Sequence, residues 1–153
     1  MGGSMRPAGR GGLVREIVGD LHGMFQAIER YSKRSLRECG LTGPQIWALR
    51  VLREAGSLTV GGLAARMYMH ISSASNLLNR IEAKRFIVRR RDDADQRIVR
   101  LAITPAGRRV ASRRPAPPRS RLPQALKRMP TRELREMHRA VRRIGAIMKD
   151  DGG

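Results

Sequence analysis

The sequence predicts a mostly α-helical chain with one small β-hairpin, and three observations support that fold class. Apolar residues recur at spacings of three and four over most of the 153 residues, which is the period of amphipathic helices. Residues 86–103 instead read as two short strands around an Asp-rich turn, as a hairpin does. Hydrophobic residues make up 41% of the chain, which is enough to build a packed core.

The N-terminal part predicts a tail and then a long helix. Residues 1–12 are Gly-rich without periodicity, so we expect a disordered tail, with MGGS as an expression-vector remnant before Met5. A seam of apolar side chains at four- and three-residue spacing then predicts one amphipathic helix over residues 13–38. The seam consists of Leu13, Ile17, Leu21, Met24, Ile28 and Tyr31.

Three shorter helices are expected next. The first covers residues 43–55 between a Thr-Gly-Pro start and a glycine stop. Thr59 is the expected N-cap of a helix over residues 60–67, and Ser72 is the expected N-cap of a helix that runs to about Lys84. The last two helices are joined by a short turn, which describes a helix-turn-helix.

The second helix of this pair carries an informative polar face. Its members are hydrogen-bond donors and acceptors of moderate length: Ser72, Ser73, Ser75, Asn76, Asn79 and Arg80. Such side chains read base edges and phosphates in a DNA major groove. An ordinary solvated helix face is the alternative interpretation.

A hairpin is expected directly after the helix-turn-helix. Residues 86–91 and 97–103 predict its two strands, and Asp92–Gln96 favour the turn because aspartates bond to their own backbone. A hairpin in this place is a wing. Residues 41–104 therefore predict a winged helix-turn-helix DNA-binding domain.

The segment after the hairpin predicts a helix that ends early. Thr104 is its expected N-cap and Pro105 its first residue. Prolines between residues 114 and 118 predict a break there. Residues 108–128 are basic and contain no acidic residue, and we interpret them as exposed surface in preference to a DNA contact.

A second apolar seam lies on the last helix, which is expected to begin at Thr131. The seam consists of Leu134, Met137, Val141, Ile144 and Met148. Such a seam needs a partner surface, and the first helix carries another one. We therefore expect residues 13–40 and 105–149 to form the helical dimerisation region of a homodimer.

The charge points to the kind of partner. A formal net charge of +19 favours a polyanion, with nucleic acid first and an anionic membrane surface second. Aromatic residues make up only 3%, which disfavours a single-strand binder that stacks bases, so double-stranded DNA is the expected partner.

Other classes of function lack their sequence signals. The chain has no apolar run of membrane-spanning length, nucleophile–base motif, P-loop or dinucleotide fingerprint, and its histidines lack metal-ligand spacing. We expect no enzyme activity, no metal and no cofactor. The single Cys39 rules out an intrachain disulfide, so the cytoplasm is the expected compartment.

The order LTGPQIWALRVL, LTVGGLAARM, ISSASNLLNRIEAKRFIVRR and DADQRIVRLAITPAGRR resembles the MarR family of bacterial winged-helix transcriptional regulators. The most specific part is Asp95, one residue, Arg97, an apolar strand and a Thr-x-x-Gly helix start. The resemblance implies a dimer that places the helix from Ser72 in the major groove and Arg97 in the flanking minor groove of a pseudo-palindromic operator. One departure is Arg85, where the family usually has Gly. If the backbone there is left-handed, a side chain is unfavourable by about 1 kcal/mol, which a phosphate contact could offset.

We therefore expect a dimeric, sequence-specific regulator that binds double-stranded DNA, of the repressor type, released by a small-molecule or other signal. The alternative is a low-specificity architectural DNA-binding protein. Asp95 is expected to hold the Arg97 guanidinium. The expected DNA-binding residues are Ser72, Ser73, Ser75, Asn76, Asn79, Arg80, Arg89, Arg90, Arg91, Asp95, Arg97 and Arg100.

A small-molecule effector could bind between the dimerisation and DNA-binding parts. The candidate lining residues are Met24, Phe25, Ile28, Trp47 and Met67, and ordinary core packing is the alternative for each. The cysteine of redox-sensing relatives lies near the start of the first helix, whereas Cys39 lies at its end. A packed cysteine is therefore favoured over a redox sensor.

Overall fold

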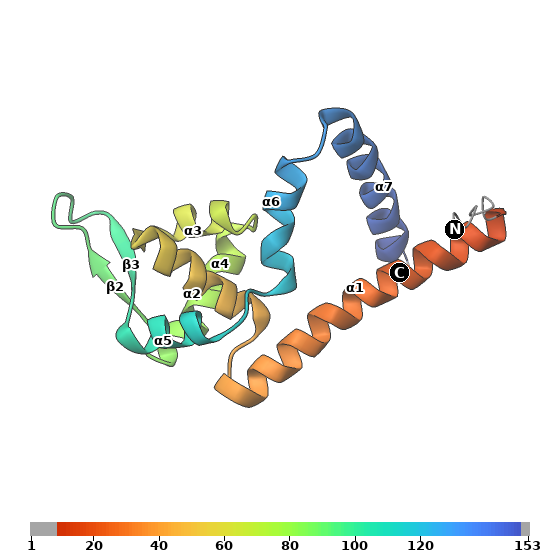
Figure 1. Cartoon of the computed structure of the whole chain (residues 1–153). Coiled ribbons are helices and arrows are strands. Elements are labelled where there is room, and N and C mark those ends of the chain that lie inside the picture. Colours follow the sequence, from red (N-terminus) through yellow and green to blue (C-terminus); the bar gives the residue numbers. More distant parts are fainter. Residues whose placement is uncertain (1–8, 151–153) are drawn as a thin grey trace. The chain divides into compact units, whose positions relative to one another are not determined.

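The structure is a computed structural model that describes residues 9–150, and the chain divides into two compact units between Ser120 and Arg121 (Figure 1). The first unit contains α1 (Arg10–Cys39), α2 (Gly43–Ala55), β1 (Ser57–Leu58), α3 (Val60–Arg66), α4 (Ile71–Ala83), β2 (Ile87–Arg91), β3 (Val99–Ile103) and α5 (Pro105–Arg113). A 3-10 turn (Pro118–Arg121) leads to α6 (Leu122–Lys127) and α7 (Thr131–Asp150). The predicted fold class, mostly α with a small hairpin wing, is confirmed.

Helix α1 starts earlier than predicted. The Gly9 carbonyl accepts the N–H groups of Gly12 and Leu13 at 2.7 and 3.2 Å, so the helix begins at Arg10 and includes the end of the predicted tail. Residues 1–8 of that tail lie outside the described residues. At the other end Gly40 has a φ of 67°, and its N–H bonds to the Leu36 carbonyl, which closes the helix.

The core of the first unit is built around α2. Thr42 and Gln45 form the capping box at its start, and Gly56 follows its end, as predicted. Eight of the 13 residues of the helix are buried, because α3, α4, α5 and the sheet all contact it. The largest fully buried apolar side chains are Leu41, Ile46, Leu49, Leu52, Leu63, Met67, Leu78, Ile81, Ile87 and Leu101.

The predicted helix-turn-helix is present, with one boundary corrected. Thr59 caps α3 by accepting the Gly62 N–H at 3.0 Å, as predicted. Helix α4, however, begins at Ile71, because the backbone of His70 is extended and its carbonyl accepts the Ala74 N–H at 3.0 Å. Ser72 is therefore not the N-cap. It lies inside the first turn with an exposed side chain.

Both helices of the helix-turn-helix end on a residue in the left-handed region. Arg85 follows α4 with a φ of 58°, and the next N–H, from Phe86, reaches back to the Ile81 carbonyl at 3.2 Å. Tyr68 closes α3 in the same way with a φ of 54°. The left-handed backbone at Arg85 is the conformation in which the family's glycine would be favoured.

The wing is slightly shorter than predicted and has an extra strand beside it. Strands β2 and β3 pair antiparallel, with Arg90 opposite Arg100, and β1 pairs with the other side of β3. Strand β3 begins at Val99 instead of Arg97, because the turn continues until the Ile98 N–H bonds to the Asp95 carbonyl. Strand β1 has two residues, too few to show an alternating pattern.

The Thr-x-x-Gly motif joins the wing to α5. The Thr104 hydroxyl accepts the Gly107 N–H at 3.1 Å and donates to the backbone carbonyls of Arg85 and Phe86. A Cβ at residue 107 would collide with the Phe86 carbonyl, so only glycine allows this close approach. The helix ends at Arg113, as the prolines predicted.

In the second unit, α7 follows Pro130, whose carbonyl accepts the Leu134 N–H at 3.0 Å. Thr131 is thus the first helical residue, and the predicted cap lies one residue too late. None of the helices in the described part of the chain is both long and apolar enough to cross a membrane.

Candidate nucleic-acid interface

The polar face of α4 lies open to solvent. Its buried side is formed by Ala74, Leu78 and Ile81, which anchor the helix to the core. The exposed residues are Ser72, Ser73, Asn76, Asn79 and Arg80, and Ser75 is half-buried. Their spacing places Ser72, Asn76 and Asn79 along one side of the helix, because residues three and four apart share a face.

A cluster of polar side chains ties the wing to this helix. One guanidinium nitrogen of Arg89 donates to Glu82 Oε2 and the other donates to Asn79 Oδ1 at 2.9 Å. In the strand register Arg89 lies opposite the buried Leu101, so it is on the face of the sheet that packs toward the core. Arg89 thus forms contacts within the protein, and its predicted phosphate contact stays a prediction.

Glu82 is a residue that the sequence reasoning did not single out. It is the only acidic side chain on α4, and the packing of β2 against α4 brings Arg89 next to it. Its carboxylate orients the guanidinium and leaves the Asn79 amide N–H group as a donor toward solvent. Together the three residues link α4 to strand β2.

Asp92 organises the turn of the wing. Its Oδ1 accepts the N–H groups of Ala94 and Asp95 at 2.9 and 3.3 Å, and its Oδ2 forms an ion pair with Arg100. The Arg100 hydrogen bond, and after it those two backbone donors, lower the pKa of Asp92 below its usual value. This carboxylate therefore stabilises the turn and also connects it to Arg100 of β3.

The predicted contact between Asp95 and the Arg97 guanidinium is replaced by a backbone contact. Asp95 Oδ1 accepts the main-chain N–H of Arg97 at 2.9 Å. The expectation assumed an extended chain at these residues, whereas the chain is still turning until Ile98. Asp95 thus fixes the backbone from which the exposed Arg97 side chain projects.

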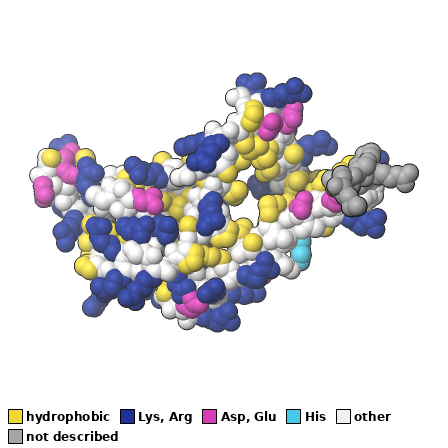
Figure 2. Space-filling model, in the orientation of Figure 1, with side chains coloured by type: hydrophobic (Ala, Val, Ile, Leu, Met, Phe, Trp, Pro, Cys, Tyr) yellow, Lys and Arg dark blue, Asp and Glu magenta, His cyan; other side chains and the backbone are white. Residues whose placement is uncertain are grey.

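Several arginines of this region are exposed and have no ion-pair partner within residues 9–150. They are Arg80, Arg90, Arg91 and Arg97, of which Arg91 donates to the Gln96 carbonyl at 2.7 Å. Figure 2 shows Lys and Arg side chains spread over the winged-helix portion, with acidic side chains gathered at the end of the hairpin. The wing and α4 therefore present a polar, cationic surface.

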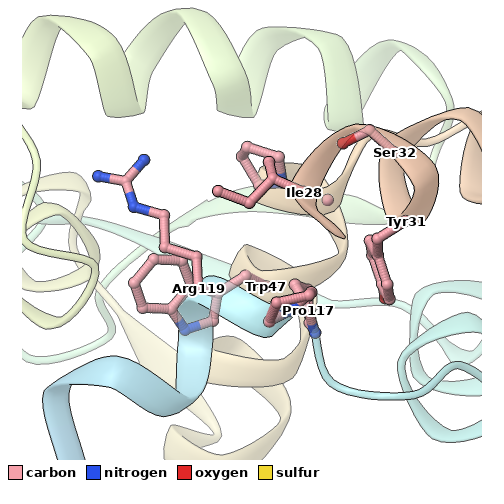
Figure 3. A pocket seen from close by; sticks show the side chains of 9 residues that line it. Ile28, Tyr31, Ser32, Trp47, Pro117 and Arg119 are labelled. Carbon is pink, nitrogen blue, oxygen red and sulfur yellow. The ribbon is translucent and has the colours of Figure 1, made fainter. Parts of the chain in front are cut away.

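A small cavity of about 100 Å³ lies between α1, the start of α2 and the segment after α5 (Figure 3). Its lining residues are Ile28, Tyr31, Ser32, Gly43, Pro44, Trp47, Pro117, Pro118 and Arg119. The Tyr31 hydroxyl donates to the Pro115 carbonyl at 2.6 Å, and burial raises the pKa of this tyrosine.

Two of the five predicted pocket residues, Ile28 and Trp47, line this cavity. Met24 and Phe25 do not, and they are exposed on α1, because the cavity faces the last turns of the helix. Met67 is fully buried in the core. Cys39 is half-buried, with its thiol donating to the Ser35 carbonyl at 3.1 Å. Across residues 9–150, no three His, Cys, Asp or Glu side chains are grouped as metal ligands.

A helix-turn-helix whose second helix exposes a polar face beside a basic hairpin defines a winged helix-turn-helix protein. A model of the MarR family matches residues 40–98. Over these residues the chain is similar to the MarR family.

The most similar curated relatives include two proteins of Bacillus subtilis. The uncharacterized HTH-type transcriptional regulator YsmB is 31% identical over 97 residues, which are 63% of this chain and 66% of the relative. The HTH-type transcriptional repressor MdtR is 32% identical over 95 residues, which are 62% of this chain and 61% of the relative. The match thus spans slightly less than two thirds of these relatives.

Solved structures resemble the chain over more of its length. A MarR family protein from Bacillus stearothermophilus is 27% identical with a TM-score of 0.53, covering 93% of this chain and 99% of that one. FabT of Streptococcus pneumoniae in complex with DNA has a TM-score of 0.59 at 17% identity, and the match covers 90% of this chain and 98% of that one. At that identity the second likeness shows the fold alone.

Proposed function

We propose that this protein is a dimeric, sequence-specific regulator of transcription that binds double-stranded DNA as a repressor and is released by a signal. The observation that carries the proposal is the exposed Ser and Asn face of α4 next to a wing with solvent-exposed arginines. A duplex offers base edges to the first surface and phosphates to the second.

In this proposal α4 enters the major groove. Asn76 and Asn79 have the amide groups that pair with adenine through two hydrogen bonds, and each such pair contributes about 1–3 kcal/mol of discrimination. The serines donate to bases or to adjoining phosphates. Asn79 already accepts a hydrogen bond from Arg89, so its amide is held in one orientation before DNA arrives.

The wing would act on the backbone and the minor groove. Arg97 projects from the turn that Asp95 and Asp92 organise, and a narrow minor groove attracts an arginine through its enhanced negative potential. Arg90, Arg91 and Arg100 would neutralise phosphates. Arg89 instead links strand β2 to α4 through Glu82.

Two further observations support the dimer and the repressor role. The seams of α1 and α7 leave large apolar side chains exposed in the single chain, among them Ile17, Met24, Val141 and Met148. Such faces are covered when two copies associate. The relative MdtR is named a repressor, and occlusion of a promoter is the simplest result of tight operator binding.

The test of this proposal is the variant Arg97→Ala, compared with Arg132→Ala. Both remove one exposed positive charge, but Arg132 lies on α7, outside the winged helix. Arg97→Ala should weaken operator binding and remove the footprint of the wing, while the preference for bases under α4 persists. Equal losses in both variants, or an unchanged footprint in Arg97→Ala, would refute the assigned role.

A low-specificity architectural protein is the second candidate, and the net charge of +19 favours it. Competition between the operator and unrelated duplex at physiological salt separates the two functions. A specificity ratio above about 10³ supports the regulator, and a ratio below it supports the architectural protein.

The signal could act through the cavity lined by Ile28 and Trp47, which joins α1 to the start of α2. A ligand that lowers operator affinity a hundredfold must favour the DNA-free arrangement by about 2.7 kcal/mol. Titration of the protein–operator complex with candidate small molecules measures that difference.

A further inference from the structure

Each of the helices α1 to α4 is followed by a residue with positive φ, which is either a glycine or a residue with a bulky side chain. After α1 and α2 the residue with positive φ is a glycine, Gly40 and Gly56. After α3 and α4 it is Tyr68 and Arg85. A bulky side chain is unfavourable in this backbone region, so the two positions inside the helix-turn-helix retain strain that glycine would remove. Such strained residues concentrate at functional surfaces.

Tyr68 belongs to a small apolar surface at the start of α4. Its side chain is 58% exposed, and Ile71, three residues later, is 60% exposed. A Cβ at residue 61 of α3 would lie 4.0 Å from Ile71 Cδ1, and the glycine at that position adds no side chain that would cover Ile71. Two large apolar side chains thus remain uncovered beside the polar Ser72.

Ile71 is exposed at the N-terminal end of its helix. It is the first residue of α4, three residues before the buried Ala74 and seven before the buried Leu78, so it continues the buried stripe beyond the core. Ser75, four residues later, is its neighbour on the other side, so Ile71 borders the polar face. A recognition helix contacts base edges mainly through its N-terminal residues, so Ile71 would stand at the edge of the major groove.

We infer that Ile71, with Tyr68 beside it in the turn, is a specificity-determining residue that recognises the C5-methyl group of thymine. Thymine is the one base whose major-groove edge carries a methyl group, and apolar side chains contact it. The serines and asparagines of α4 supply hydrogen bonds but no comparable apolar surface. This inference rests on the proposed function, because it requires α4 to enter a major groove.

The experiment first identifies the operator by selection of bound duplexes, and then replaces each thymine of one half-site by deoxyuridine. Uracil keeps the hydrogen-bonding edge of thymine and lacks only the methyl group. At the thymine that Ile71 contacts, the affinity of the wild-type protein should fall about fourfold, the effect of losing one buried methyl-sized group. Deoxyuridine outside the half-sites should change nothing.

The variants assign the effect to the side chain. Ile71→Ala should bind the thymine and deoxyuridine operators equally, whereas Ile71→Val, which keeps branched methyl groups at Cβ, should retain most of the preference. Equal affinity of the wild-type protein for every deoxyuridine duplex would overturn the inference. So would a thymine preference that survives in Ile71→Ala.

Tyr68→Gly gives an independent readout. Removing a strained side chain should raise the midpoint of thermal unfolding, and removing an apolar contact should weaken operator binding at the same time. A purely structural tyrosine would not lower the affinity of a more stable protein, so a stabilised variant with unchanged affinity would exclude Tyr68 from the contact.

Failure of this inference differs from failure of the proposed function. If the wild-type protein selects an operator but ignores the thymine methyl groups, only the role of Ile71 and Tyr68 falls. If no duplex is selected over random sequence, the proposed function itself falls, and the inference falls with it.

Discussion

At the scale of single residues, Arg85 is notable because it stands where the MarR family usually has glycine. Its φ of 58° is a conformation that glycine adopts without strain. The arginine side chain is exposed, so core packing does not explain its presence. The proposed binding of DNA by α4 would account for it through a phosphate contact of the guanidinium, because the position follows directly on α4.

Replacing Arg85 by glycine should therefore separate stability from DNA binding. We expect Arg85→Gly to stabilise the fold by about 1 kcal/mol in denaturant unfolding, because the strain is relieved. It should weaken binding to all duplexes and reduce the salt dependence by about one phosphate contact. Arg85→Lys keeps the charge and serves as the control. Unchanged affinity in the glycine variant would assign the arginine no contact.

We expect Asp92 to make the wing sensitive to acid. Its pKa is lowered, mainly by Arg100 and then by the Ala94 and Asp95 N–H groups. A carboxyl group whose pKa is lower in the folded state stabilises the fold fully at any pH above its pKa in the unfolded state, which is about 4. This stabilisation is lost as the pH falls through the pKa of the folded state.

We therefore expect the wing to loosen below about pH 4, before the rest of the domain unfolds. The amide signals of Ala94 and Asp95 report this transition in an NMR titration. Asp92→Asn keeps an oxygen that accepts the two backbone bonds but does not titrate. An identical acid transition in the Asn variant would show that another group controls the wing.

At the scale of elements, the wing depends on backbone contacts made by its aspartates. Asp95 accepts the Arg97 N–H, so its carboxylate shapes the turn in addition to carrying charge. Asp95→Ala should weaken operator binding although it removes a negative charge from a DNA-binding surface. Asp95→Asn keeps the acceptor oxygen and should bind at least as well as the wild-type protein. Tighter binding by the Ala variant at every salt concentration would mean that simple electrostatics dominates.

The elements themselves could be predicted well from the sequence, because their signals are local. Caps such as Thr59 and Thr104 act within three residues, and prolines end helices wherever they stand. The first residue of α4 was missed, because His70 takes the cap position through its backbone while a better capping residue, Ser72, stands nearby.

The candidate site could be predicted only in part. Exposure of Ser72, Asn76 and Arg97 follows from helical period and turn position. The ion pair of Arg89 with Glu82 depends on how β2 packs against α4, and that of Arg100 with Asp92 depends on the register of the hairpin. Those are tertiary quantities that no short sequence window contains.

At the scale of the whole molecule, the exposed apolar seams of α1 and α7 favour the proposed association of two copies. Val141 on α7 is 60% exposed in the single chain. We expect Val141→Glu to shift the protein from dimer to monomer in sedimentation and to weaken operator binding, because two linked half-sites are lost together. Arg142→Glu, also on α7 but outside the apolar seam, is the control. A dimer of unchanged stability in Val141→Glu would place the interface elsewhere.

Selection of bound duplexes from a random pool tests the central claim most directly, because it measures specificity and symmetry in one step. The account predicts one enriched motif, made of two half-sites related by two-fold symmetry with centres about 10 bp apart. Recovery of duplexes with no motif above the starting pool would contradict sequence-specific recognition by α4, and a single unsymmetrical site would contradict the dimer.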